Sequence, residues 1–582
     1  AFWFLPFLSS STWMNDMGWE KYTKYSDHLL ARDITEMSLS GMPYRNIVFA
    51  LAGLGVILSL LHRVRLGWFL ALTVMVFAWI FRYFPQYRLW NARLLPFLYL
   101  AIYLLAGLAI ALVIRSLVIA VQDLTSRRDE PLAVGLIGTG VVVLALAVVL
   151  LGGMRALPGG QSVPDPGDPS STVFKWAGLH FESSIVRDWA RWNYEGLEGK
   201  PAYGEFSGIV DMMSDVGEEH GCGRAMWEYE GDLQRFGTPM ALMLLPYFTD
   251  GCIGSMEGLY FEASSTTPFH FLNQSELSVG PSRAQRDLPY SAFDIDKGVQ
   301  HLQLMGVKYY MATTEAAVTA ARGHEDLTEL AAETFVTTGT DGLPVEHTWA
   351  VFEVADAELV TPLAYDPVVL SDADDHIDGW VYAAEHAPAV EGMPKPPKDP
   401  GPAVLWYNDP TRWDVLLATS GPEDWPRAPS TDLDPPRQAT AEATVSDIEM
   451  TSDSVSFSVD EVGVPVLVKV SYFPNWTVSG ADGPYRVSPN FMVVVPTEHD
   501  VVLSYGNRPS DLLGWFLTVV GLGLLGVLGA WDVRDRRRRG DDPDAPEGDA
   551  LEDQPVPGGV ADQLVPGGAR EESPDEPAAA PS

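Results

Sequence analysis

Arginine side chains gather just before one of the long apolar runs of the chain. Arg88 and Arg93 fall in the segment 87–96, which reads YRLWNARLLP. A guanidinium presents several fixed N–H donors, and the first turn of a helix adds unpaired backbone N–H groups, so Arg93 suits a lipid phosphate or pyrophosphate. The same arginines could instead anchor to lipid headgroups or pair with acidic groups outside the membrane. The pattern alone leaves both readings open.

Carboxylates among aromatic rings form a second group of residues with chemical potential. Asp16 and Glu20 lie in the segment 13–22, WMNDMGWEKY. Carboxylates accept hydrogen bonds from sugar hydroxyls and aromatic rings stack on apolar sugar faces, so the segment suits sugar binding. Tryptophan and tyrosine are also usual in any loop at a membrane surface, and this plainer reading is favoured.

A third group lies in the long polar region of the chain. Its polar and aromatic residues that could face a glycan are Trp227, Glu228, Glu257, Glu262, His270 and Glu276. Two carboxylates at a suitable separation would serve glycoside chemistry, but nothing in the spacing identifies such a pair. Substrate-facing and structural roles therefore have similar weight. We find no phosphate-binding glycine loop, no Ser-His-Asp order and no metal motif in the sequence.

Cys222 and Cys252 are the two cysteines of the chain. Both fall in a region that the helix pattern below places outside the cytoplasm, where two cysteines favour one disulfide. A zinc site that adds His220 and His270 is the alternative, but it lacks compact ligand spacing. We expect the disulfide.

Long apolar runs predict the helices that position these groups. Leu512 to Trp531 is long enough to span a bilayer, and the arginines that follow, Arg534 and 536–539, mark a cytoplasmic end. Four further complete spans are expected at about 46–61, 66–81, 94–121 and 132–151, with an outer loop at 9–45. The protein is thus predicted to be a multi-pass plasma-membrane protein with residues 155–510 outside and the tail 532–582 in the cytoplasm.

Arginines test this topology. Counting back from the last span, the turns with Arg63 and Arg65 and with Arg127 and Arg128 fall inside, as the positive-inside rule requires. The segment with Arg82, Arg88 and Arg93 falls outside. This exception is the reason for assigning a binding role to that segment.

The sequence pattern divides the region expected outside the cytoplasm into several parts. The predicted order is a linker at 154–173, an α+β domain at 174–385, a linker and irregular segment at 386–438, and a β-sandwich-like module at 439–507. Within the α+β domain we expect a helix over 315–333 and strands over 307–312 and 348–354. The fold class is therefore a membrane α-helical part with an outer α+β domain and a β-sandwich-like module.

Composition restricts the class of partner. The formal net charge of −39 argues against nucleic-acid binding, which needs a basic face. The tail after Gly540 is rich in proline, glycine and acidic residues, which is typical of disorder. The sequence begins without methionine inside an apolar run, and we expect it to be the C-terminal part of a longer membrane protein.

Three phrases of the sequence resemble a known family. They are WNARLLPF at 90–97, HLQLMGVKYY at 301–310 and YFPNW at 472–476. They resemble bacterial multi-pass membrane proteins labelled 6-pyruvoyl-tetrahydropterin-synthase-related, which are similar to GT-C glycosyltransferases. The resemblance covers most of residues 1–510. It implies no pterin chemistry.

The resemblance implies transfer of a sugar from a polyprenyl-phosphate donor to an envelope glycan or lipid outside the cytoplasm. Cationic groups would stabilise the departing phosphate, a role that it assigns to Arg93 with Asn91 and Arg88. GT-C enzymes carry their catalytic acid in the first outer loop, which this sequence does not include, so the catalytic residue is unknown. No cofactor is identified, and a divalent metal would be held by that same part. The module at 439–506 resembles carbohydrate-binding-like modules.

Two functions remain from the sequence. The first is a GT-C type glycosyltransferase whose partners are the bilayer, the polyprenyl-phosphate donor and the acceptor. The alternative is a non-catalytic, membrane-anchored glycan-binding or scaffold protein of the cell envelope. A transporter is disfavoured because the apolar runs contain almost no ionisable residues.

Overall fold

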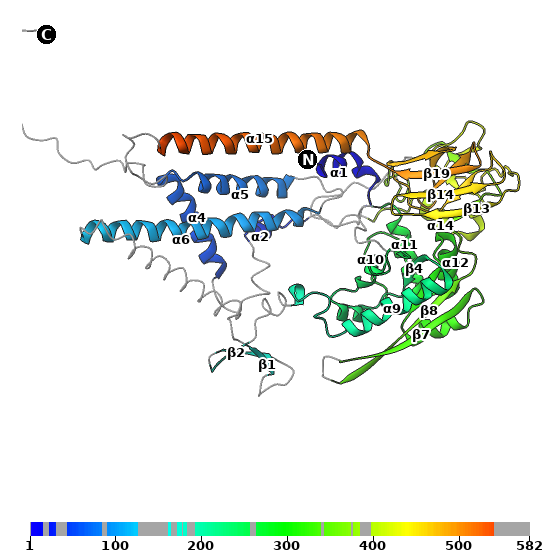
Figure 1. The fold of residues 1–582 in the computed structure, drawn as a ribbon, viewed down its shortest axis with the longest axis horizontal. Helices are drawn as coiled ribbons and strands as arrows, with labels where there is room; N and C mark the ends of the chain where they lie inside the picture. The colour runs from blue at the N-terminus through cyan, green and yellow to red at the C-terminus, as the bar shows by residue number, and fades with distance from the viewer. Residues whose placement is uncertain are drawn as a thin grey trace, which may run out of the picture.

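The computed structural model describes most of the chain outside its tail. The described residues are 2–15, 22–30, 44–83, 90–125, 161–164, 172–176, 178–182, 192–256, 264–338, 343–373, 376–383, 397–432 and 434–540. Long helices lie along the long axis of the molecule, and most of the strands gather at one end (Figure 1).

Three described helices are long and apolar enough to cross a membrane, which indicates membrane association. They are α5 (Arg65–Tyr83), α6 (Leu95–Thr125, preceded by the 3-10 turn η2, Asn91–Leu94) and α15 (Pro509–Gly540). They match the expected spans at 66–81, 94–121 and 512–531. The helix α4 (Tyr44–Leu61) contains a shorter apolar stretch, Val48–Leu61. The expected span at 132–151 and the tail after Gly540 lie outside the described residues.

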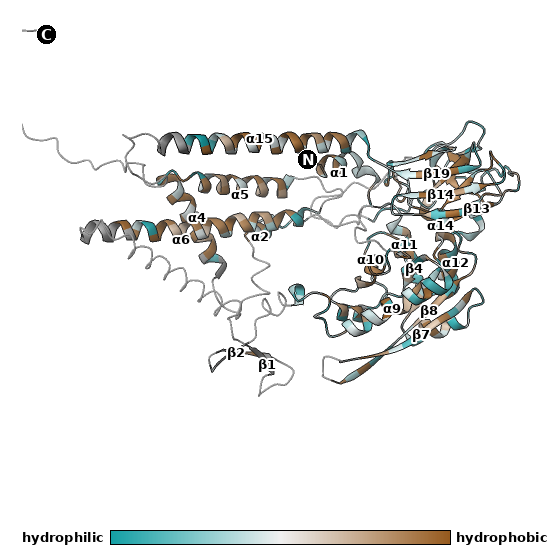
Figure 2. Ribbon diagram, in the orientation of Figure 1, coloured by the Kyte–Doolittle hydropathy of each residue, from teal (hydrophilic) through white to brown (hydrophobic). Residues whose placement is uncertain are grey.

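The helices α4, α5 and α6 pack into one bundle, and glycines permit their close approach. A Cβ at Gly55 would lie 2.3 Å from the carbonyl oxygen of Leu105, and one at Gly67 would lie 1.9 Å from Oγ of Ser59. Small residues of this kind are usual where membrane helices pack closely. Figure 2 shows that α5 and α15 are hydrophobic along much of their length.

The last long helix has a different neighbour. The short helix α1 (Phe4–Ser10) packs against α15, where the ring of Phe2 stacks on Trp515 with centroids 5.1 Å apart. A short helix α2 (Tyr25–Leu29) lies near the bundle, since Tyr25 packs edge-on against Phe81 of α5. The 3-10 turn η1 (Ser11–Trp13) follows α1 directly.

A five-stranded mixed sheet with its helices forms the α+β region. Its order is β5-β4-β6-β8-β7, with β4 parallel to β5 and β6 and with β8 antiparallel to β6 and β7. The strands are β4 (Gly223–Trp227), β5 (Ile253–Ser255), β6 (Tyr309–Ala312), β7 (Leu327–Thr338) and β8 (Pro344–Val354). The accompanying helices are α9 (Tyr203–His220), α10 (Leu245–Phe248), α11 (Thr267–Leu277), α12 (Ile295–Met305) and α13 (Glu315–Arg322), with 3-10 turns η4 (Gly231–Phe236) and η5 (Ala241–Leu244).

The expected strands over 307–312 and 348–354 are confirmed by β6 and β8. The helix expected over 315–333 is wrong in its second half, because α13 ends at Arg322 and β7 begins at Leu327. Gly323 follows the helix directly, and the strand that comes after is rich in threonine with Phe335 and Val336.

Two sheets facing each other form a second region, the sandwich. One sheet has the order β13-β14-β19-β16 and the other β12-β10-β11-β17-β18-β15-β9. The bounds are β9 (Val360–Pro362), β10 (Val368–Leu370), β11 (Leu417–Ala418), β12 (Arg427–Ala428), β13 (Val445–Met450), β14 (Ser454–Val459), β15 (Val466–Val468), β16 (Trp476–Ser479), β17 (Ala481–Val487), β18 (Phe491–Pro496) and β19 (Asp500–Tyr505). The alternation in β14, which buries Val455, Phe457 and Val459, directs one face of that strand into the core between the sheets.

The sandwich begins earlier in the sequence than its pattern predicted. Strands β9 to β12 fall within 360–428, a range divided in the prediction between the α+β domain and the linker 386–438. These strands have two or three residues each, too few for an alternating pattern to show. The same range holds α14 (Pro402–Tyr407) and η6 (Pro410–Arg412), with Trp406 and Tyr407 fully buried.

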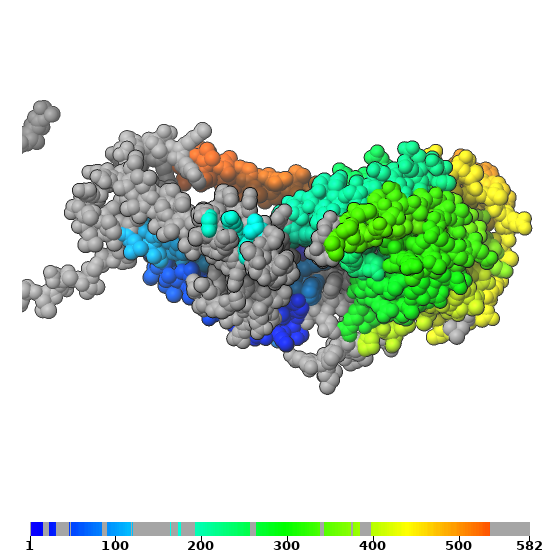
Figure 3. Space-filling view, turned by 90° about the horizontal axis from the view of Figure 1, so that it is seen from below, coloured from blue at the N-terminus to red at the C-terminus, as the bar shows by residue number. Residues whose placement is uncertain are grey.

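One hydrophobic core joins the α+β region and the sandwich. It runs from Met226 of β4 through Trp380 and Trp406 to Val493 of β18. Figure 3 accordingly shows the α+β region and the sandwich as one continuous body. A separate three-stranded antiparallel sheet has the order β1 (Gln161–Pro164), β2 (Thr172–Trp176) and β3 (Leu179–Glu182), and its first strand falls inside the predicted linker 154–173.

Candidate functional site

The segment directly after α1 is bound by the α+β region and the sandwich. The carbonyl oxygen of Thr12 accepts a hydrogen bond from the backbone N–H of Ile377 at 3.1 Å, and that of Trp13 accepts one from the hydroxyl of Ser265 at 2.7 Å. The side-chain amide of Asn15 donates to Gln285 at 2.8 Å. These bonds join the N-terminal helical part to the α+β region and to the sandwich.

The ring of Trp13 completes this attachment. Its centroid lies 5.5 Å from that of Tyr472, and the guanidinium carbon of Arg486 lies 5.5 Å from it. The same guanidinium lies 5.0 Å from the ring of Trp380, so the cation contacts two indole rings in a buried position. The Trp13 side chain therefore fixes how the first helix meets the sandwich.

A pocket of about 500 Å³ lies beside this attachment, between α1, the sandwich and the first turn of α15. Its lining residues are Pro6, Phe7, Ser10, Met14, Ser264, Ser452, Val470, Ser471, Tyr472, Phe473, Asn475, Trp476, Tyr505 and Asp511. The phrase YFPNW at 472–476 supplies four of them. The pocket therefore lies at the junction where the chain passes from the sandwich into a long apolar helix.

The lining is rich in aromatic rings and hydroxyls. Trp476 packs edge-on against Tyr505 with centroids 5.4 Å apart, and Phe473 lies 6.3 Å from Tyr505. Among the described lining residues, Asp511 carries the one formal charge. Rings, hydroxyls and one carboxylate suit a sugar, whereas a phosphate would call for cationic partners.

Asp511 is oriented by two neighbours. One carboxylate oxygen accepts the backbone N–H of Arg508 at 2.7 Å and faces the side-chain amide of Asn475 at 3.4 Å. An acid in the first turn of a helix is also favoured by the helix dipole. Among the described residues, no hydrogen-bond donor contacts the other carboxylate oxygen, so that oxygen can accept a sugar hydroxyl.

Tyr505 has a well-defined protonation state. Burial raises the pKa of its phenol, and the nearby Asp511 carboxylate raises it further, while Arg508 acts in the opposite direction. The phenol therefore stays protonated at neutral pH, and its O–H can donate a hydrogen bond.

The residues proposed for a phosphate have different surroundings. Asn91 is fully buried: its oxygen accepts the backbone N–H of Tyr22 at 3.0 Å, and its amide donates to the carbonyls of Tyr22 at 3.1 Å and Phe81 at 3.3 Å. These bonds give Asn91 a structural role, because they join the backbone at Tyr22 to the end of α5. Arg93 is exposed on η2 and is not among the residues that line the pocket, and Arg88 lies outside the described residues.

The predicted glycan-facing residues of the α+β region lie in its interior. Trp227, Glu228, His270 and Glu276 are all buried, away from any surface that a glycan could reach. The structure therefore does not bring these four to a binding surface. Asp16, Glu20, Glu257 and Glu262 lie outside the described residues.

Glu228 caps a helix. Its carboxylate accepts the backbone N–H groups of Thr313 and Thr314 at 2.9 and 2.8 Å and the hydroxyl of Thr314 at 2.7 Å. Thr314 is the N-cap of α13, so this buried acid lies at the positive end of the helix.

Glu276 binds two cationic or polar partners. It lies 2.9 Å from the ammonium of Lys297 and 2.5 Å from Nδ1 of His301. The other imidazole nitrogen of His301 donates to the carbonyl of Tyr407 at 2.9 Å, and the two rings stack 3.8 Å apart. This network joins α11, α12 and α14, and gives Glu276 a structural role.

The disulfide between Cys222 and Cys252 is confirmed. It connects the residue directly before β4 to the residue directly before β5. Among the described residues, no group of three or more histidine, cysteine or acidic side chains could hold a metal ion.

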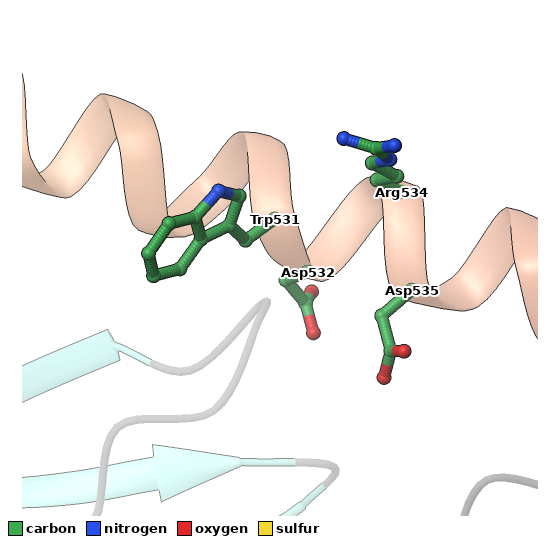
Figure 4. Close-up of a pocket in the computed structure, with 4 residues that line it drawn as sticks. All are labelled: Trp531, Asp532, Arg534 and Asp535. Atoms are coloured by element: carbon green, nitrogen blue, oxygen red, sulfur yellow. The ribbon is translucent and has the colours of Figure 1, made fainter.

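A second pocket lies on the outside of α15, far from the sandwich. Figure 4 shows Trp531, Asp532, Arg534 and Asp535 on adjacent turns, with the two carboxylates on one side and the guanidinium on the other. All four belong to one exposed helix segment. Such a surface is typical of a helix end at a membrane boundary.

The sequence reading did not identify Asp511 or Tyr505. The signal available in the sequence was the position of an acid just inside the start of the last apolar helix. That this acid lies next to the phrase YFPNW is seen only in the structure. No protein-family model, no curated protein and no solved structure matches the chain.

Proposed function

We propose that this chain is part of a GT-C type membrane glycosyltransferase that transfers a sugar from a polyprenyl-phosphate donor to an envelope glycan or lipid. The observation that carries the proposal is the aromatic pocket with a single carboxylate at the start of α15. Its lining suits a sugar, and its place at the base of an apolar helix suits a sugar attached to a lipid.

Position along the membrane normal supports this assignment. A polyprenyl phosphate keeps its chain in the bilayer and its phosphate at headgroup level, so its sugar lies just above the membrane surface. Asp511 is in the first turn of α15, and Tyr505 precedes the helix by four residues. The pocket therefore lies at the height at which such a sugar would emerge.

The proposed topology places different parts of the chain on the two sides of the plasma membrane. Residues 155–510 lie outside the plasma membrane, and the end of α15 with Arg534 lies in the cytoplasm with the turn between α4 and α5. In Figure 1 that turn and the far end of α15 lie away from the β-rich regions, while α6 begins near them. This arrangement agrees with the positive-inside rule for Arg63 and Arg65.

Arg93 is the proposed contact to the donor phosphate. It is exposed in η2, at the outer start of α6, where the backbone N–H groups of the first turn add to its charge. In GT-C enzymes the catalytic carboxylate belongs to the first outer loop, so we assign no base among the described residues. Any divalent metal would be bound by that same loop.

A transfer assay tests the proposal. The full-length protein in membranes is offered a panel of polyprenyl-phosphate sugars, with Arg93→Ala, Asp511→Asn and, as a control, Asp356→Asn, an exposed acid outside the pocket. We expect transfer by the wild type and the control, loss in Arg93→Ala and reduction in Asp511→Asn. Absence of transfer from every donor by folded, inserted protein would overturn the enzymatic proposal.

A non-catalytic glycan-binding protein is the second candidate. The pocket favours it equally, because binding needs the rings and the carboxylate but no base. It predicts that the wild type binds an envelope glycan without transferring sugar, and that Asp511→Asn weakens the binding.

A further inference from the structure

The pocket at the start of α15 carries a negative charge that its own lining does not compensate. Asp511 is the one charged residue among the described residues that line it. In the part of the chain that the structure describes, Arg508 binds this carboxylate through its backbone N–H, and its guanidinium makes no ion pair there. Backbone and amide donors orient a carboxylate but leave its full charge in place. A ligand that displaces water from Asp511 must therefore supply a partner for that charge.

Aromatic rings line the same pocket. Trp476 lies edge-on to Tyr505 with centroids 5.4 Å apart, and Phe473 lies 6.3 Å from Tyr505. The face of an aromatic ring is electron-rich and attracts a cation. Because burial and the Asp511 carboxylate both raise the pKa of Tyr505, its ring stays a neutral phenol and adds no second negative charge. A carboxylate beside several ring faces suits an ammonium group.

Hydroxyl groups supply further hydrogen-bond acceptors. The lining includes Ser10, Ser264, Ser452 and Ser471. An ammonium group has three N–H donors and no acceptor, so serine oxygens can take the donors that Asp511 does not. The described lining holds no lysine, arginine or histidine. A carboxylate, sulfate or phosphate substituent on the ligand would consequently find no cationic partner in it.

We propose that the sugar bound in this pocket is an amino sugar whose ammonium group lies against Asp511 and the rings of Trp476 and Tyr505. The inference rests on the proposed function, since it names the class of sugar that the same site takes. The second carboxylate oxygen of Asp511 accepts one N–H, and the rings stabilise the positive charge. A neutral sugar would occupy the same space but would leave the carboxylate without a counter-charge.

Binding of lipid-linked sugars tests the inference. The probes are polyprenyl phosphates that share one lipid chain and carry glucose, 2-amino-2-deoxyglucose, 4-amino-4-deoxyglucose or N-acetylglucosamine. Because the chains are identical, the probes partition equally into nanodisc lipid, and differences in binding to the full-length protein come from the sugar. The two amino sugars present the ammonium at different positions. N-acetylation keeps the nitrogen but removes its charge.

The preference should depend on the charge of Asp511. We expect one of the amino sugars to bind about tenfold more tightly than glucose, and N-acetylglucosamine to lack this advantage. Asp511→Asn should remove the preference, because its amide is uncharged although it can still accept the N–H of Arg508. Trp476→Leu should reduce the preference, whereas Asp356→Asn, which alters an exposed acid outside the pocket, should leave it unchanged. Thermal unfolding of each variant separates a lost preference from lost folding.

Three results would overturn the inference: equal affinity for glucose and both amino sugars, a preference that survives in Asp511→Asn, or binding of none of the probes. The proposed function is decided separately, by transfer. Transfer of neutral sugars alone would support the enzyme and contradict the amino sugar. A charge-dependent preference without transfer from any donor would support the amino sugar and contradict the enzyme.

Discussion

The side-chain amide of Asn475 lies 3.4 Å from the carboxylate of Asp511 and donates to the carbonyl of Gly506 at 2.8 Å. Asn475 belongs to the sandwich, while Asp511 is in the first turn of α15. A flexible tether between the two would not need these contacts. The sandwich is thus fixed to the start of the helix, and the pocket between them keeps a defined place relative to α15.

Loss of the disulfide should weaken the α+β region. Replacing both Cys222 and Cys252 by serine removes a cross-link between residues 30 apart in sequence, which we expect to lower the free energy of unfolding by about 2–5 kcal/mol. Thermal unfolding in nanodiscs, with and without reductant, measures this. Reductant should destabilise the wild type and leave the double variant unchanged; a wild type indifferent to reductant would contradict the prediction.

We expect Glu228→Ala to lower the stability of the protein and not to remove a ligand contact. Three donors around Thr313 and Thr314 would lose their buried acceptor, so we expect a loss of about 3 kcal/mol in the free energy of unfolding. The control is Glu218→Ala, an exposed acid on α9. If Glu228→Ala abolished ligand binding at full stability, its assignment as a helix cap would be wrong.

The burial of Lys469 should make the free energy of unfolding depend on pH. Burial lowers the pKa of this ammonium from 10.5 to about 8, with Arg224 acting in the same direction and Glu358 against it. Between pH 8 and 10.5 the unfolded chain therefore holds a proton that the folded chain has released, so stability attributable to Lys469 rises with pH in this window. Below pH 8 both states are charged, and burial of the charge costs about 3 kcal/mol.

The variant Lys469→Met isolates this effect. It removes the buried charge but also the hydrogen bond from Lys469 to the carbonyl of Gln303 at 3.0 Å, near the end of α12. We expect its stability relative to the wild type to be greatest at pH 7 and to fall as the pH rises from 8 to 10. A difference independent of pH over that range would show that Lys469 is not desolvated.

Substitution of Asn91 should affect stability, whereas substitution of Arg93 should affect use of the donor. Asn91→Ala removes three hydrogen bonds of a buried amide and should lower stability by about 2 kcal/mol. Arg93→Ala alters an exposed side chain and should leave the amount of folded protein unchanged while abolishing donor use. Thermal unfolding and donor binding, measured on both variants, separate the two roles.

The pattern of hydrophobic residues in the sequence predicted helices and strands correctly where these elements are long. Apolar runs predicted α5, α6 and α15, and alternation predicted β14 and its neighbours. Strands β9 to β12 have no such pattern because each contributes only two or three residues. The helix predicted over 315–333 was too long. The residues after Gly323 form a strand because they pair with β8, which lies later in the chain and which helical periodicity cannot reveal.

Side-chain roles were harder to predict. A pair of cysteines was enough to predict the disulfide, but four polar or aromatic residues assigned to a glycan surface are buried. Their partners come from distant segments: Glu228 is bound by Thr313 and Thr314, and Glu276 by Lys297 and His301. The phrase YFPNW contributes to the pocket, but its junction with Asp511 depends on the tertiary fold.

The most direct measurement is photo-cross-linking of a donor to the pocket. A polyprenyl-phosphate sugar with a diazirine on the sugar is bound to the full-length protein in nanodiscs, irradiated and mapped by mass spectrometry. We predict cross-links within residues 472–476 and in the first turn of α15, competed by unlabelled donor and reduced in Tyr505→Ala but not in Tyr247→Ala. Cross-links confined to other segments, or insensitive to competing donor, would contradict the assignment of this pocket to the sugar.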